Sequence, residues 1–164
     1  MRDQLIASET YTDMRPDRLF LLVAALYLLG GSALGVWMGV NHDFSLRPLH
    51  AHINLVGWAS MALFGLTYRA FPEIGTSRLA WAHFTFALTA SILFPAGLYQ
   101  VSMGNEFGVI GELGVLLWLV SGLLFAVATA RLASAKRCRD ESSVWGLPNN
   151  DRTKPPLPKH VPID

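Results

Sequence analysis

The apolar residues of this chain gather into four long segments separated by short polar stretches. The segments are residues 19–40, 49–68, 79–99 and 109–130. Each is close to the roughly 20 residues that an α-helix needs to cross a ~30 Å hydrocarbon core. The pattern predicts an all-α membrane protein with a four-helix transmembrane domain over residues 19–130.

Polar segments flank this domain on both sides. We expect residues 1–18 to form a cytoplasmic N-terminal segment, and residues 131–164 a cytoplasmic, disordered tail, because its Pro-rich sequence cannot bury a core. Only 15% of the residues are charged, against roughly 25% in a soluble domain. A net charge of +1 gives no reason to expect nucleic acid as a partner. The lone Cys138 excludes an internal disulfide, and no Cys-x-x-Cys-His motif offers covalent haem attachment.

The positive charges beside the spans indicate an orientation. Only Arg47 falls on one side, and the other side carries Arg2, Arg15, Arg18, Arg69, Arg78, Arg131, Lys136, Arg137 and Arg139. We therefore expect a multi-pass protein of the bacterial inner (cytoplasmic) membrane with both termini cytoplasmic. The loops at residues 41–48 and 100–108 would face outward, and short loops make sequential helices antiparallel neighbours. In the first span, Gly31, Gly35 and Gly39 predict close helix packing.

His50 and His52 are the most informative residues of the sequence. Neighbouring helical residues are rotated by about 100°, so these two side chains point to nearly opposite sides. One helix therefore offers one imidazole to each of two flanking clefts. Histidines inside a membrane are costly and mark function by default. The alternative is an interfacial pair that is hydrogen-bonded to headgroups or to loop backbone.

His83 is a poor second ligand for the same metal, because the depths differ. His52 lies roughly 12 Å on the outer side of its helix midpoint, and His83 roughly 9 Å on the inner side. Axial ligands of one haem need similar depths, so His83 is expected at the interface or on a proton path from the cytoplasm. Glu112, near the start of the fourth span, is expected to exchange protons with haem or quinol, or to be a helix-start residue at the positive end of the dipole.

The missing second ligand can come from a copy of the chain. In a homotrimer around an axis normal to the membrane, each cleft would receive His50 of one subunit and His52 of the next. The ~3 Å height offset between them is within the range of helix tilt, and such a closed ring is an ordinary oligomer. Ligation by two histidines suits electron transfer.

A family resemblance supports this arrangement. The residues His50-Ala-His52, Gly65 and Phe71-Pro72 resemble the tenth helix of subunit I in the haem–copper oxidase superfamily, which includes cytochrome c oxidases and nitric oxide reductases. The resemblance implies that the chain is one four-helix arc of that twelve-helix architecture. It matches His50 to the high-spin haem ligand and His52 to the low-spin haem ligand.

The chain also departs from that family. Nothing after Pro72 supplies the His-His pair of the copper site, so oxygen reduction at a standard haem–copper centre is not supported. Arg47 suits the family's propionate-binding arginines by position, or is a snorkelling residue at the interface. Trp58 would pack on the macrocycle, or serve only in helix packing.

We therefore expect a b-type cytochrome that holds haem b between subunits, with a quinol or a cytochrome as its electron partner. Two alternatives stay open. A haem with an open iron position would bind or reduce oxygen or nitric oxide. Six histidines of a trimer would hold copper, as in a copper-binding or assembly subunit of a respiratory complex.

Overall fold

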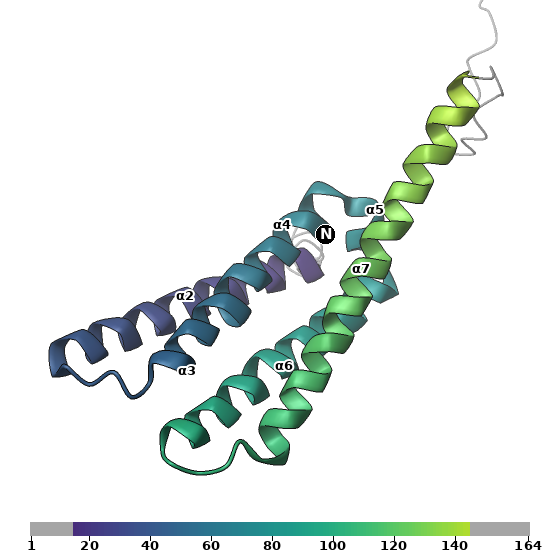
Figure 1. The fold of residues 1–164 in the computed structure, drawn as a ribbon. Helices are drawn as coiled ribbons and strands as arrows, with labels where there is room; N and C mark the ends of the chain where they lie inside the picture. Colours follow the sequence, from purple (N-terminus) through teal and green to yellow (C-terminus); the bar gives the residue numbers. More distant parts are fainter. Residues whose placement is uncertain (1–14, 145–164) are drawn as a thin grey trace, which may run out of the picture. The chain divides into compact units, whose positions relative to one another are not determined.

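A computed structural model describes the backbone of residues 15–144 and the side chains of residues 15–134. The described backbone is helical and contains no strand (Figure 1). Four helices are long and apolar enough to cross a membrane, and they comprise Pro16–Asn41, Arg47–Ala70, Arg78–Ser102 and Gly108–Ser134. This confirms the predicted all-α class and the four spans. Each span extends a few residues beyond its predicted apolar segment.

Local sequence signals explain where the helices begin and end. Pro16 occupies the first position of α2 (Pro16–Asn41), where its missing N–H costs no hydrogen bond. His42, with a positive φ of 52°, ends this helix in the left-handed conformation. Ser77 caps α6 (Arg78–Ser102), since its hydroxyl accepts the N–H of Ala80 at 3.2 Å.

The second span is not one regular α-helix. It consists of α3 (Arg47–His52), the π-helix η1 (Ile53–Ser60) and α4 (Met61–Ala70). The Ser60 hydroxyl donates to the carbonyl oxygen of Leu55, five residues earlier, at 2.8 Å. π-Helical turns are rare and are frequent at functional sites. The sequence pattern did not predict this segment, which begins directly after His52.

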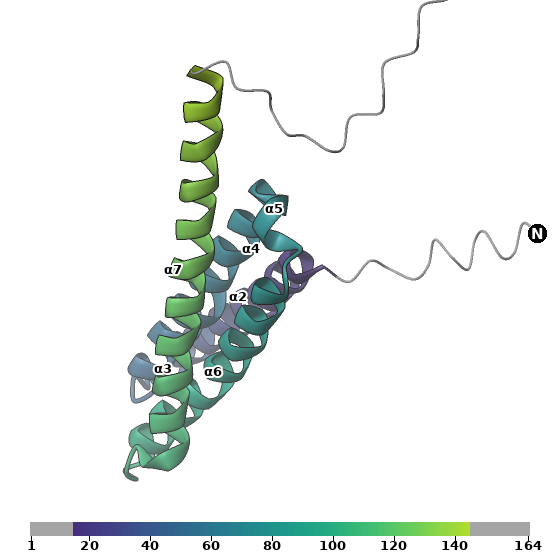
Figure 2. The same cartoon turned by 90° about the vertical axis from the view of Figure 1, so that its right-hand side faces the viewer.

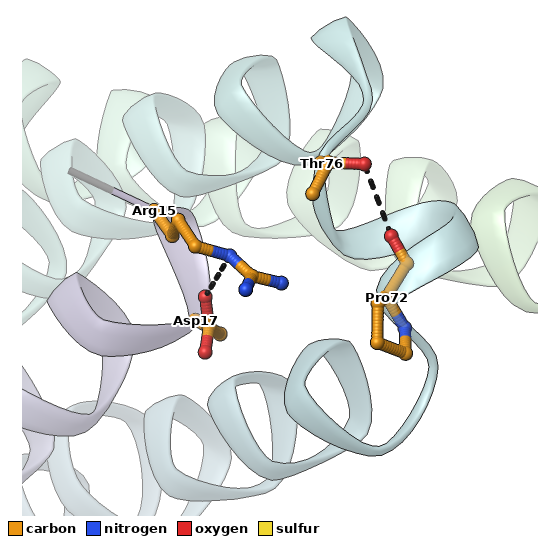
Figure 3. Close-up of polar contacts among 4 residues, drawn as sticks. All are labelled: Arg15, Asp17, Pro72 and Thr76. Carbon is orange, nitrogen blue, oxygen red and sulfur yellow. Dashed lines mark hydrogen bonds and ion pairs between the residues drawn. The ribbon is translucent and has the colours of Figure 1, made fainter. Parts of the chain in front are cut away.

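The short helix α5 (Pro72–Gly75) turns the chain from α4 into α6. The Thr76 hydroxyl donates to the carbonyl oxygen of Pro72 at 3.0 Å, which closes this turn (Figure 3). The same figure shows Arg15 and Asp17 at the start of α2, where they form an ion pair at 3.4 Å. The loop after α2 and the loop after α6 lie at the opposite end of the bundle (Figure 1). We call that end, with residues 42–46 and 103–107, the histidine end.

The helices pack through a small aromatic and aliphatic core. The first span, α2, lies against η1 and α4 of the second span. The core centres on Phe20, Met61, Tyr68, Ala80, Phe84 and Ala87. The large leucines and valines outside it are exposed, as expected for surfaces that face lipid rather than water.

The last helix runs past the expected start of the tail at residue 131. Helix α7 (Gly108–Val144) continues well past the end of its apolar segment (Figures 1 and 2). Residues 131–144 contain neither Pro nor Gly, and eight of the fourteen are Ala, Leu, Arg, Lys or Glu, which favour helix. The Pro-rich remainder of the tail and most of the predicted N-terminal segment lie outside the described residues.

Candidate functional site

His50 is inserted between the first two helices. Its ring lies against Gly35 of α2, where an added Cβ would stand 2.9 Å from His50 Cε1. One turn away, an added Cβ at Gly31 would stand 2.7 Å from both polar atoms of the Asn54 amide group. The small residues predicted to mediate packing therefore make room for polar side chains. Gly39 takes no part, since nothing lies within 4 Å of its would-be Cβ.

Asn54 fixes the hydrogen bonding of His50. Its amide nitrogen donates to the backbone carbonyl of His50 at 2.9 Å and lies 3.4 Å from His50 Nδ1. Because the carbonyl can only accept, the amide nitrogen must face this side, and His50 Nδ1 is then the acceptor. The proton of the neutral ring consequently stands on Nε2.

His52 has the opposite hydrogen-bonding pattern. Its Nδ1 lies 2.8 Å from the backbone carbonyl oxygen of Pro48, which can only accept, so Nδ1 carries the proton. The lone pair of Nε2 is therefore available. The ring stands edge-on against Phe94 of α6, with centroids 5.0 Å apart. An imidazole that donates through one nitrogen to a carbonyl and presents the other is the usual form of a metal-ligating histidine.

The two imidazoles thus face different neighbours, because His50 contacts α2 and His52 contacts α6. This separation is the one expected from helical rotation, since both residues precede the π-helix. Within residues 15–134 no group of three or more His, Cys, Asp or Glu side chains could hold a metal ion.

His83 lies in the interior of the bundle, with no exposed surface. Its Nδ1 is 2.8 Å from the Tyr68 hydroxyl, and the rings of Phe20, Phe64 and Phe125 surround it. The ring that His52 contacts belongs to Phe94. Phe94 lies eleven residues after His83 in α6, which corresponds to ~16 Å along the helix. His83 is therefore a core residue that is far from the His52 level, and a role in proton transfer stays a prediction.

The Tyr68–His83 hydrogen bond is expected to stabilise the fold. Replacing Tyr68 with Phe leaves His83 Nδ1 buried without a partner, since Nε2 already has none. The expected loss is about 1–3 kcal/mol of unfolding free energy. Denaturant titration in detergent, followed by circular dichroism, measures it. Thr67→Val is the control, because the Thr67 hydroxyl bonds only to the Leu63 carbonyl of its own helix, and an equal loss there would contradict the prediction.

The other predicted site residues lie on the surface. The Arg47 Nε donates to the Phe44 carbonyl at 3.3 Å, and its guanidinium lies 5.5 Å from the Phe44 ring centroid. Trp58 lies in η1 and is 40% exposed. Glu112 is exposed and makes no hydrogen bond or ion pair within residues 15–134. The structure thus brings none of these three into contact with His50 or His52 of the same copy.

A shallow, mostly apolar hollow lies on the surface formed by α2 and η1. Its volume is about 310 Å³, and it is lined by Leu26, Tyr27, Gly30 and Ile53. The Tyr27 hydroxyl donates to the Ser91 carbonyl at 2.8 Å and so ties α2 to α6.

Sequence reasoning gave no role to Pro48, Asn54 or Phe94. The sequence indicated a contact between Asn54 and His50, because Asn54 lies four residues after His50 and hence on the same helix face. No sequence pattern indicated the contact of Phe94 with His52, since this contact depends on how α6 packs against the second span. Comparison with protein-family models, with curated proteins and with solved structures finds no match for the chain.

Proposed function

We propose that this chain is a membrane-embedded b-type cytochrome that binds haem between copies through His50 and His52 and transfers electrons. The observation that carries the proposal is the hydrogen bond from His52 Nδ1 to the Pro48 carbonyl at 2.8 Å. It holds an otherwise costly membrane imidazole in the tautomer and orientation that iron ligation requires. The resemblance of His50-Ala-His52 and Phe71-Pro72 to haem–copper oxidase subunit I supports the same role.

The residues of the site fit haem to different degrees. His52 fits as it stands, since Nε2 is free and Nδ1–H is already bonded. His50 fits less well, since its Nδ1 faces the Asn54 amide nitrogen and Nε2 then carries the proton, so the ring would have to leave this contact before Nε2 could bind iron. Haem would supply a reversible one-electron change at iron. Two histidines would leave no open position there, which suits electron transfer rather than gas binding.

A homotrimer is part of this proposal. His50 contacts α2 and His52 contacts α6 of the same copy, which supports opposed imidazoles on one second span, and a ring of copies would give each cleft between copies one histidine of each kind. Arg47 at the histidine end would offset propionate charge, and Trp58 would cover part of the macrocycle. A bacterial inner membrane with cytoplasmic termini, and quinol or a cytochrome as electron partner, complete the proposal.

A second function is favoured by one observation. Asn54 occupies His50 Nδ1, so that only His52 is ready to bind iron without rearrangement. With one axial histidine, the opposite iron position would stay open. The protein would then bind or reduce oxygen or nitric oxide.

One set of spectra tests both functions. We expect protein purified from haem-replete cells to give a b-type pyridine haemochrome, with about one iron per chain. A reduced low-spin spectrum that carbon monoxide does not change supports the electron carrier, whereas a carbon monoxide adduct supports the open iron position. Copper without iron would remove both haem functions and leave the copper alternative.

A further inference from the structure

Two rows of exposed residues lie on the surface of the membrane-spanning helices. The first row runs along α7 and comprises Glu112, Leu116, Leu119 and Leu123. The second runs along the second span and comprises Arg47, Ala51, Leu55 and Trp58. Successive members are three or four residues apart, so the α7 row follows one side of its helix for ~16 Å, and Arg47 and Ala51 share one side of α3. Leu55 and Trp58 are exposed residues of the π-helix that continues the second span.

Each row has a single charge, and both charges lie at the histidine end. Glu112 makes no hydrogen bond or ion pair in the described part of the chain, and Arg47 is bound only by the Phe44 carbonyl and ring. Glu112 lies four residues inside α7, about 6 Å along the helix. Ionisable groups at such positions almost always pair or face a protein interior.

The other charged residues at the histidine end, Asp43 and Glu106, lie in loops and belong to neither row. Asp43 accepts the backbone N–H of Ser45 at 3.0 Å, and this hydrogen bond lowers the pKa of its carboxyl. Glu106 lies in the loop before α7 and is open to solvent. The exposed apolar faces of α2 and α6 carry no charged residue between positions 19 and 41 or between 79 and 102. At the histidine end of residues 15–134, only the rows of α7 and the second span therefore combine an exposed apolar strip with a charge, while the exposed strip of α2 has its charge, Arg18, at the opposite end.

We infer that the α7 row of one copy packs against the second-span row of the next copy, where Glu112 forms an ion pair with Arg47. Copies in one membrane share their orientation, so the two charges meet at the same end. Helical side chains tilt toward the N-terminus, which directs the Glu112 carboxylate back toward Arg47. Arg47 has five N–H donors, so this pairing leaves others for a propionate.

The contact joins different surfaces of the two copies and is therefore of the kind that closes into a ring. It also places the helix that carries His50 and His52 at the boundary between copies. The inference deepens the oligomer of the proposed function and rests on it. It does not require haem, because the charges and the apolar rows belong to the chain itself.

Thiol cross-linking in membranes tests the packing of the rows. In a Cys138→Ser background, a chain with both Ala51→Cys and Leu116→Cys should give dimers and closed higher species with a short bismaleimide. Either cysteine alone should give monomers only. Equal cross-linking of the single variants would show a symmetric contact, and no cross-linking of the pair would show no contact; both results would overturn the inference.

Charge exchange tests the ion pair. Arg47→Glu and Glu112→Arg should each weaken association about tenfold, measured by energy transfer between labelled copies in liposomes, and the double exchange should restore it. Glu106→Arg is the matched control, with the same charge change at the same end and no expected effect. Failure of the double exchange to restore association would refute the pair. Haem absorbance recorded on the same samples separates the outcomes, since cross-linking without haem contradicts only the cofactor.

Discussion

Replacing Gly114 with alanine is expected to destabilise the bundle strongly. An added Cβ would stand 2.7 Å from Phe94 Cα and 2.8 Å from the Leu93 carbonyl carbon. These are backbone atoms and cannot rotate away, so α6 and α7 must separate. Overpacking of this kind costs about 1–3 kcal/mol, and the rigid neighbour places this case near the upper limit. Unfolding of the purified protein in mixed micelles, followed by circular dichroism, measures the change.

Gly122→Ala is the matched control in the same helix. Nothing lies within 4 Å of the Cβ that this substitution adds. Removing a helical glycine should then stabilise the protein by about 0.5–1 kcal/mol. Opposite signs at Gly114 and Gly122 are therefore expected. Equal effects at the two positions would show that α6 and α7 do not pack as described.

The Gly114 substitution also reaches the candidate site. Phe94, whose backbone contacts Gly114, is the ring against which His52 stands. A shift of α6 would move this ring and loosen the orientation of the imidazole. We expect the variant to bind haem more weakly even where it stays folded, a consequence that follows only if the cofactor proposal holds.

The four spans could be predicted from the sequence because a membrane imposes a length and a polarity on every helix. The facing of His50 and His52 toward different neighbours followed from the fixed rotation per residue, since both lie in the regular part of the second span. Gly31 and Gly35 predicted a close approach. The side chains that approach these glycines are those of Asn54 and His50. Predicting them would have required the register between α2 and the second span, which one sequence does not contain.

The π-helix and the interior of the bundle were beyond prediction for related reasons. Nothing in residues 53–60 distinguishes them from an α-helical segment, because the same residue types occur in the α-helices α2 and α6. His83 looked interfacial from its position near the start of a span. Its burial depends on the rings of Phe20, Phe64 and Phe125, which three other helix segments supply.

The histidine substitutions are expected to have the largest effect on function. His52→Ala removes the imidazole that already presents Nε2, and we expect the haem content of purified protein to fall more than about tenfold. His50→Ala should cause a similar loss if both histidines bind each iron. If only His52 binds, the His50 variant should instead keep its haem. Iron and haemochrome analysis of each variant measures the loss.

His42→Asn is the matched control for these variants. His42 is exposed in the loop before α3, and its positive φ of 52° is one that asparagine tolerates. This variant should keep full haem. In His52→Gly, added imidazole should restore the absorption spectrum, because the free ligand replaces the missing ring while the Pro48 carbonyl stays in place to accept its N–H. Full iron and unchanged spectra in both alanine variants would exclude His50 and His52 as ligands, and the inter-copy contact of Arg47 and Glu112 would then need a different purpose.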